Sequence, residues 1–229
     1  MAEYAGKIPV YIGKNPIALY THQEDAIKTL NKEVSPKNEF SGLLVLPTGG
    51  GKTLTAAQWL MRDYIDQNKK VLWIAHRHTL LDQAKESFQS NAYKNILKKR
   101  NSFNYRIISS IHDQIDHIEA EDDLLIVSSL ISENGLNSLI KNWIGKNIEH
   151  LILVIDEAHH AIAKSYRQLI TTIKKKVTNF HMIGLTATPS RTSQNQQGLL
   201  KKLFPDDIVY KIDLRTLIIR GILAEPHFE

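Results

Sequence analysis

The stretch GLLVLPTGGGKT, residues 42–53, decides the fold of this chain. Its apolar residues predict a strand over Gly42–Leu46, and three consecutive glycines follow after only two residues. A pattern of helical period begins directly after the glycines, at Lys52. Glycines let the backbone turn tightly and point successive N–H groups at one place, and the start of the helix adds a partial positive charge. This strand–loop–helix order predicts a phosphate-binding loop.

The residue types in the loop predict how it would hold a nucleotide. Lys52 is placed to reach the β- and γ-phosphates, and the Thr53 hydroxyl is placed to bind Mg²⁺. The general motif has a glycine where this chain has Leu46, so the loop is a variant that does not alone define the kind of NTPase. A flexible glycine turn beside a helix start is the alternative. The predicted nucleotide-binding residues of the loop are Thr48, Gly49, Gly50, Gly51, Lys52 and Thr53.

A second apolar run, LILVI over residues 151–155, leads directly into DEAHH over 156–160. Carboxylates at the end of such a strand lie at the carboxyl edge of a parallel sheet, where ligands bind in open α/β folds. Asp156 is therefore a predicted Mg²⁺ ligand, and Glu157 is predicted to orient and deprotonate an attacking water. With Lys52 they form the predicted catalytic set, although a solvated acidic turn is the alternative. The adjacent histidines lack the H-E-x-x-H spacing, so no zinc site is predicted.

The rest of the chain alternates short apolar runs with longer segments of helical period, which predicts a doubly wound α/β domain. Several runs are apolar on both faces, as in the inner strands of a mostly parallel sheet with helices on both faces. Strands are predicted at Gly42–Leu46, Val71–Ala75, Tyr105–Ser109, Leu124–Ser128, Leu151–Ile155, Met182–Thr186 and Ile208–Ile212. Helices are predicted at Lys52–Gln67, Thr79–Ser90, Asn134–Trp143, Lys164–Lys176, Leu199–Phe204 and from Asp213 to a stop at Gly221.

Composition narrows the class of protein. The chain has 229 residues, of which 42% are hydrophobic and 23% charged, as expected for one globular domain with at most a small appendage. It has no cysteine, no signal-peptide pattern and no apolar stretch near the roughly 20 residues that span a bilayer, so we expect a cytoplasmic location without a membrane partner. A net charge of +5 permits nucleic-acid binding without demonstrating it.

Three motifs in order, LPTGGGKT (46–53), DEAHH (156–160) and GLTATP (184–189), resemble the first RecA-like motor domain of superfamily 2 helicases. With AHRHTLLDQ (75–83) and the DEAH spelling, the chain is most similar to the branch of restriction-enzyme translocating subunits and DEAD/DEAH-type DNA helicases. The resemblance implies a RecA-like fold, ATP and Mg²⁺ as cofactors, and hydrolysis coupled to movement on nucleic acid, with DNA favoured over RNA.

The resemblance also implies roles for residues outside the two catalytic motifs. Gln23 would hydrogen-bond the adenine edge, and a glutamine on a helix face is the alternative. Thr186 and Thr188 would couple the nucleotide site to nucleic acid by relaying hydrogen bonds from Glu157 or His159.

The resemblance also implies nucleic-acid contacts at three residues in two segments. His76 and Arg77 follow a predicted strand and would contact the phosphate backbone, with a capped exposed loop as the alternative. Ser129 would supply a second backbone contact. Residues 91–104 are basic and residues 112–123 acidic; both are predicted to be solvated, and the basic one could touch phosphates.

The resemblance further implies a division of the chain. Residues 1–212 would form the RecA-like domain, and residues 213–229 a helix and the start of a linker to a second RecA-like domain. Arg191, Arg215 and Arg220 do not fit the pattern of the arginine finger that the second domain supplies, so the isolated domain should bind nucleotide but hydrolyse it slowly. A nucleotide-dependent nucleic-acid sensor without unwinding activity is the alternative function, and a P-loop kinase is a weaker one.

Overall fold

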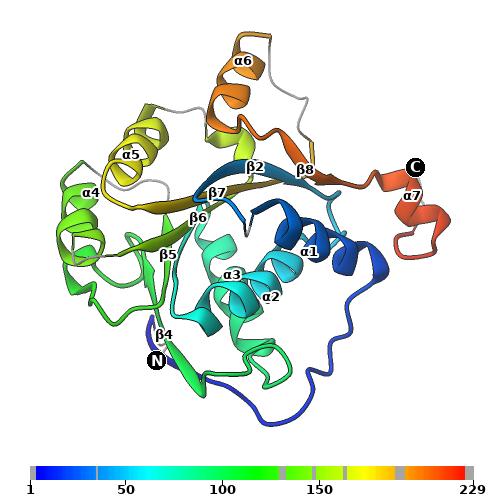
Figure 1. The fold of residues 1–229 in the computed structure, drawn as a ribbon, viewed down its shortest axis with the longest axis horizontal. Helices are drawn as coiled ribbons and strands as arrows, with labels where there is room; N and C mark the ends of the chain where they lie inside the picture. The colour runs from blue at the N-terminus through cyan, green and yellow to red at the C-terminus, as the bar shows by residue number, and fades with distance from the viewer. Residues whose placement is uncertain are drawn as a thin grey trace.

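A computed structural model describes residues 4–34, 36–128, 133–145, 148–161, 164–188 and 194–224. Within them, eight strands form one sheet in the order β1-β4-β5-β3-β6-β7-β2-β8 (Figure 1). Every neighbouring pair is parallel except β1 and β4, which are antiparallel. The strands are β1 (Ala5–Pro9), β2 (Glu39–Val45), β3 (Lys70–Ala75), β4 (Ser102–Ile108), β5 (Leu124–Ser128), β6 (His150–Asp156), β7 (Asn179–Thr186) and β8 (Ile208–Lys211).

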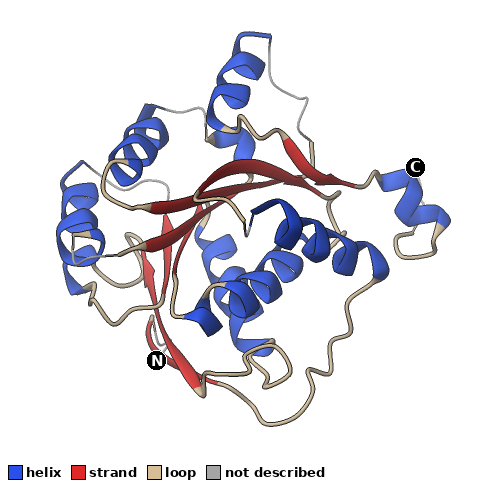
Figure 2. Cartoon of the chain, viewed as in Figure 1, coloured by secondary structure: helices blue, strands red, loops and turns tan. Residues whose placement is uncertain are grey.

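Helices cover both faces of this sheet (Figure 2). One face packs against α1 (Thr21–Val34), α2 (Lys52–Asp63) and α3 (His78–Ser90). The other face packs against α4 (Glu133–Leu139), which continues as a π-helix (Ile140–Ile144), and against α5 (Lys164–Lys174) and α6 (Gln194–Leu203). A seventh helix, α7 (Leu214–Ile219), follows the edge strand β8.

Strand β3 shows how the sequence produces a sheet that is covered by helices on both faces. Val71, Trp73 and Ala75 belong to the core under α1–α3, whereas Leu72 and Ile74 belong to the core under α4–α6. Successive side chains of a strand point to opposite faces, so a continuous apolar run is buried on both. The predicted doubly wound α/β fold is confirmed, and each of the seven predicted strands overlaps an observed one.

Two elements were missing from the prediction. Strand β1 contains Gly6 and Pro9, which are rare in strands, and it forms only as an antiparallel edge on β4. Helix α1 has mainly polar residues, and its narrow buried stripe includes Ala26, Ile27 and Leu30. Both elements depend on tertiary contacts that a local pattern does not show.

Some helices begin or end at other residues than predicted. Helix α2 ends at Asp63 because Tyr64 leaves helical geometry, and a 3₁₀ turn follows at Ile65–Gln67. Helix α6 begins at Gln194, before the predicted Leu199. The predicted stop of the tail helix at Gly221 is confirmed, since this glycine has φ +67°.

The acidic and basic segments are less solvated than predicted. The backbone N–H groups of Lys98, Lys99 and Arg100 donate to the Asp66 carboxylate over 2.8–3.1 Å, which fixes the basic loop. Asp122 and Asp123 of the acidic segment are buried, so the prediction of a solvated face is wrong for these two residues.

Candidate functional site

The glycine loop follows β2 and turns into α2 through backbone conformations that favour glycine. Gly49 and Gly51 both have φ +80°, and the Gly50 N–H donates to the Pro47 carbonyl over 2.9 Å. Gly51 is the N-cap residue of α2, and no side chain caps the helix there. The first N–H groups of a helix have no intrahelical acceptor, and they carry its partial positive charge. The loop therefore leaves backbone donors free at the start of α2, and the binding of a phosphate there stays a prediction.

Gln23, in the first turn of α1, lies against this loop. Its Oε1 accepts the Tyr20 N–H over 2.9 Å, and its Nε2 donates to the Gly50 carbonyl over 3.3 Å. The contact is close, since a Cβ placed on Gly51 would lie 2.2 Å from Gln23 Nε2. Gln23 is thus part of the nucleotide-site candidate, and its contact with adenine stays a prediction.

The C-terminal segment packs on the loop as well. A Cβ on Gly49 would lie 2.9 Å from a Leu223 methyl carbon, and one on Gly50 would lie 3.3 Å from a Leu217 methyl carbon. Leu217 of α7 is fully buried. This part of the predicted C-terminal helix and linker is therefore packed against the glycine loop, while the division of the chain at residue 212 stays a prediction.

The acidic motif lies at the same edge of the sheet. Asp156 ends β6, and both β6 and β2 pair with β7, so the two motifs are two strand spacings apart, roughly 10 Å. Burial raises the pKa of Asp156 to about 6, and the charge of Glu157 adds to the rise. The Glu157 N–H, which donates to Asp156 Oδ1 over 3.0 Å, and the Lys52 ammonium oppose it. The sheet therefore brings Lys52 and Asp156 together.

Strand β7 brings a third motif between the other two. Leu185 is the register partner of Asp156, and Thr186 is the register partner of Val45 at the end of β2. Thr186 is buried, and its hydroxyl oxygen accepts the Thr188 N–H over 3.2 Å. Both threonines lie where a coupling role requires them, and that role stays a prediction.

Three histidine rings extend the acidic motif toward β3. His159 Nδ1 lies 3.5 Å from Glu157 Oε2, and the His159 ring centroid lies 4.2 Å from that of His160. The His160 centroid in turn lies 4.3 Å from that of His76. Partial burial, and then the charge of Arg77, lowers the pKa of His76. Among the described residues, no group of three or more His, Cys, Asp or Glu side chains could hold a metal ion.

Two of the three predicted nucleic-acid contacts, His76 and Arg77, lie just after the end of β3. Arg77 is exposed and is the N-cap residue of α3, next to His76. Ser129 lies outside the described residues. The contact between His76 and His160 joins this region to the acidic motif. No local pattern predicted it, because the two residues follow different strands.

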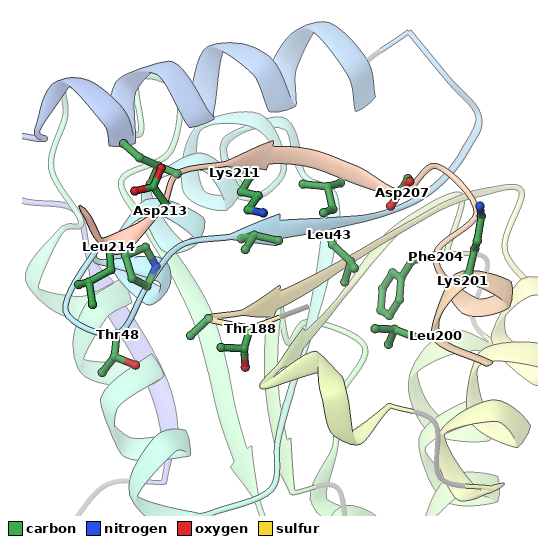
Figure 3. A pocket seen from close by; sticks show the side chains of 15 residues that line it. Leu43, Thr48, Thr188, Leu200, Lys201, Phe204, Asp207, Lys211, Asp213 and Leu214 are labelled. Atoms are coloured by element: carbon green, nitrogen blue, oxygen red, sulfur yellow. The ribbon is translucent and has the colours of Figure 1, made fainter. Parts of the chain in front are cut away.

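A cavity of about 730 Å³ opens beside the site, on the face of the sheet that carries α6 (Figure 3). Thr48 of the glycine loop and Thr188 line one part of it, and Leu43, Leu200 and Phe204 line another. Spacing in the sequence did not predict this cavity, because its walls come from the ends of three strands and from α6.

The sheet order and the motifs at its carboxyl edge define a RecA-like α/β domain. The family described as "Type III restriction enzyme, res subunit" matches residues 16–191. The chain belongs to this family, and it is a helicase-like ATP-binding domain homologous to superfamily 2 helicases and restriction-enzyme subunits.

Individual relatives agree with this membership. The chain is 25% identical over 244 residues to the ATP-dependent DNA helicase MPH1 of Pyricularia oryzae, a match that covers 100% of this chain and 21% of that protein. It is 27% identical over 219 residues to the type I restriction enzyme EcoAI endonuclease subunit of Escherichia coli, covering 93% of this chain and 24% of the subunit. The chain thus spans about a quarter or less of these relatives.

A solved structure shows the same fold. The Hef helicase domain of Pyrococcus furiosus superposes with a TM-score of 0.66 at 22% identity, covering 92% of this chain and 41% of that one. No helix in the described ranges is both long and apolar enough to cross a membrane.

Proposed function

We propose that this chain is the ATP-binding and hydrolysing motor domain of a DEAH-type DNA helicase or translocase. The observation that carries the proposal is the placement of the Lys52 ammonium near the buried Asp156 carboxylate, across the carboxyl edge of one parallel sheet. A triphosphate on the glycine loop would lie between them. Similarity to relatives such as the ATP-dependent DNA helicase MPH1 supports DNA as the nucleic acid.

The residues present fit a magnesium ion. Asp156 is buried beside a second carboxylate, and no cationic side chain that the structure describes contacts it directly. A hard divalent ion is the partner that such oxygens prefer. Asp156 and the Thr53 hydroxyl would hold the ion, which would neutralise phosphate charge when bound. Glu157 would orient a water toward the γ-phosphate and take its proton.

Other residues of the site would couple ATP hydrolysis to the bound DNA. Thr186, at the end of the strand between the glycine loop and the acids, and Thr188, just after that strand, would move with the nucleotide and pass that change to bound DNA. Arg77 and His76 would contact the DNA backbone. A second RecA-like domain in the full-length protein would supply the arginine finger and close on the nucleotide.

Calorimetry with Mg²⁺·ATP tests the proposal. Lys52→Ala removes the ammonium that contacts the β- and γ-phosphates, so we expect affinity to fall by at least about 100-fold, by analogy with charge-assisted hydrogen bonds of 1.5–3 kcal/mol acting with charge attraction. Lys28→Ala, at a side chain that is 73% exposed on α1, is the matched control and should bind as the unsubstituted protein does. Unchanged affinity in Lys52→Ala would end the proposal.

The full-length protein separates a motor from a sensor. A motor displaces a strand or a roadblock from duplex DNA when ATP is supplied, and Lys52→Ala abolishes that movement. ATP hydrolysis that duplex DNA stimulates, without any displacement or translocation, would instead identify a nucleotide-dependent sensor.

A further inference from the structure

His22 contacts the glycine loop, and the sequence analysis predicted no function for this residue. It lies in the first turn of α1, is fully buried, and its Nε2 lies 3.0 Å from the carbonyl oxygen of Gly50. A carbonyl oxygen only accepts hydrogen bonds, so Nε2 carries the proton and donates. The other ring nitrogen, Nδ1, is buried and has no hydrogen-bond partner among the described residues. The ring is therefore fixed through a single directed bond to the loop.

The Gly50 carbonyl accepts a second bond from the neighbouring residue. Gln23 Nε2 donates to it over 3.3 Å, and Gln23 Oε1 ties back to the Tyr20 N–H over 2.9 Å. The Tyr20 ring stacks on that of His22 at 15° between planes, with centroids 6.0 Å apart. One turn of α1 thus supplies two donors to one carbonyl.

The orientation of this carbonyl decides what the loop offers an anion. The same peptide plane carries the Gly50 carbonyl and the Gly51 N–H, pointing in opposite directions. Glycines flank this plane and the loop has positive φ at Gly49 and Gly51, so rotation of the peptide is sterically cheap. A rotated peptide would present a carbonyl oxygen to a phosphate in place of an N–H donor. The bonds from α1 hold the carbonyl inward and oppose that rotation.

We propose that His22 is a positioning residue, which holds the Gly50–Gly51 peptide so that its N–H faces the nucleotide phosphates. This inference rests on the proposed function, because it assumes that the glycine loop binds phosphates. His22 acts through the Gly50 carbonyl and does not touch the nucleotide. Its effect is therefore on phosphate affinity and not on recognition of adenine.

The test compares variants of the full-length protein by calorimetry with two ligands. His22→Leu keeps the apolar volume and removes the donor, whereas the Nε2 of His22→Gln can reach the carbonyl as the imidazole Nε2 does. We expect His22→Leu to weaken Mg²⁺·ATP about tenfold, the size of one neutral hydrogen bond, and His22→Gln to stay within about threefold. Magnesium tripolyphosphate, which lacks adenine, should lose affinity by the same factor as ATP.

His181→Leu is the matched control. His181 is also buried, and its Nε2 also donates to a backbone carbonyl, that of Lys37 at 2.8 Å, away from the loop. Its loss should lower the melting temperature and leave both affinities unchanged, which separates a general folding effect from positioning. If His22→Leu does not fold, His22→Asn, whose shorter side chain does not reach the carbonyl, takes its place.

The outcomes distinguish the two proposals. Equal affinity of His22→Leu and the unsubstituted protein for both ligands would overturn the positioning role alone, provided that Lys52→Ala still loses ATP. A loss for ATP without a loss for tripolyphosphate would also overturn it, because the effect would then concern adenine. If the unsubstituted protein binds neither ligand, the function proposed above fails and the role of His22 fails with it.

Discussion

Two pairs of adjacent acids lie at opposite edges of the same parallel sheet, and the chain surrounds them differently. Asp122 and Asp123 precede β5, whereas Asp156 and Glu157 end β6. Burial does not distinguish the first acid of each pair, since Asp122 is 3% exposed and Asp156 is 4% exposed. The difference lies in the positive charges within reach of each pair.

The pair before β5 is neutralised by the chain itself. Arg106 Nε donates to Asp122 over 2.8 Å, and Arg100 donates to both oxygens of Asp123 over 2.7 and 3.0 Å. Lys70 Nζ lies 3.8 Å from Asp123. At the end of β6, the Glu157 N–H is the one donor to Asp156 within the described part of the chain, and Lys52 acts on Asp156 as a nearby charge. A buried carboxylate left without a contacting cation is one that a ligand can complete, so the comparison separates a structural pair from a candidate catalytic pair.

The largest expected effect is on hydrolysis. Glu157→Gln removes the carboxylate proposed to deprotonate water, so ATP turnover by the full-length protein should fall by about 10²–10⁴ while Mg²⁺·ATP affinity is retained. Glu121→Gln, at an exposed carboxylate next to the structural pair, should hydrolyse ATP normally. Steady-state ATPase assays with DNA present make the measurement, and equal turnover in Glu157→Gln would show that the base is another residue.

Removing one charge of the structural pair, Asp122 and Asp123, should lower the free energy of unfolding. Asp123→Asn leaves Arg100 without its bidentate partner, and loss of one member of a buried ion pair costs about 3 kcal/mol of unfolding free energy. Urea denaturation at neutral pH gives this value, with Glu121→Gln as the control that stays near the unsubstituted protein. Stability of Asp123→Asn within about 0.5 kcal/mol of the unsubstituted protein would contradict the structural role.

Replacing aspartate by asparagine at the candidate site, in Asp156→Asn, should raise the free energy of unfolding, and the gain should depend on pH. The folded-state pKa of Asp156, about 6, lies above its usual value of 3.8, so the folded state binds this proton more tightly than the unfolded state does. The unsubstituted protein therefore loses stability as pH rises from 3.8 to 6, by up to about 3 kcal/mol.

Asp156→Asn does not ionise, and its amide oxygen still accepts the Glu157 N–H. Without nucleotide, the variant should match the unsubstituted protein near pH 4 and exceed it by about 1–3 kcal/mol at pH 7. Urea denaturation at both pH values measures the difference. A difference that stays constant with pH would show that the Asp156 charge is already compensated, as it is in the pair before β5.

The smallest expected effect concerns nucleic acid. Binding of DNA should weaken as salt rises, and Arg77→Ala should reduce the slope of log affinity against log salt concentration by about one. Fluorescence anisotropy with labelled duplex measures the slope. The control variant Glu121→Gln, in the acidic segment, should leave this slope unchanged. If Arg77→Ala also leaves the slope unchanged, Arg77 does not contact the DNA backbone.

The sequence predicted the sheet and the two main motifs because their signals are local. Apolar runs on both faces identify buried parallel strands. The glycine loop that leads to Lys52 follows one such strand, and Asp156 ends another. Carboxyl ends of parallel strands share one edge, so their proximity followed from topology.

The features that the sequence did not predict depend on contacts between residues far apart in the chain. His22 belongs to a helix with a narrow apolar stripe, and its partner Gly50 is 28 positions away. Asp122 and Asp123 were predicted to be solvated because an acidic run is usually exposed, and no local pattern shows that Arg100 and Arg106 fold back on them.

The most direct test is a crystal structure of the full-length protein with Mg²⁺ and a non-hydrolysable ATP analogue. We expect the Lys52 ammonium within about 3 Å of a γ-phosphate oxygen and the Asp156 carboxylate bound to the magnesium directly or through one water. A nucleotide bound elsewhere, or one that contacts the glycine loop while Asp156 stays remote from its metal, would contradict the account.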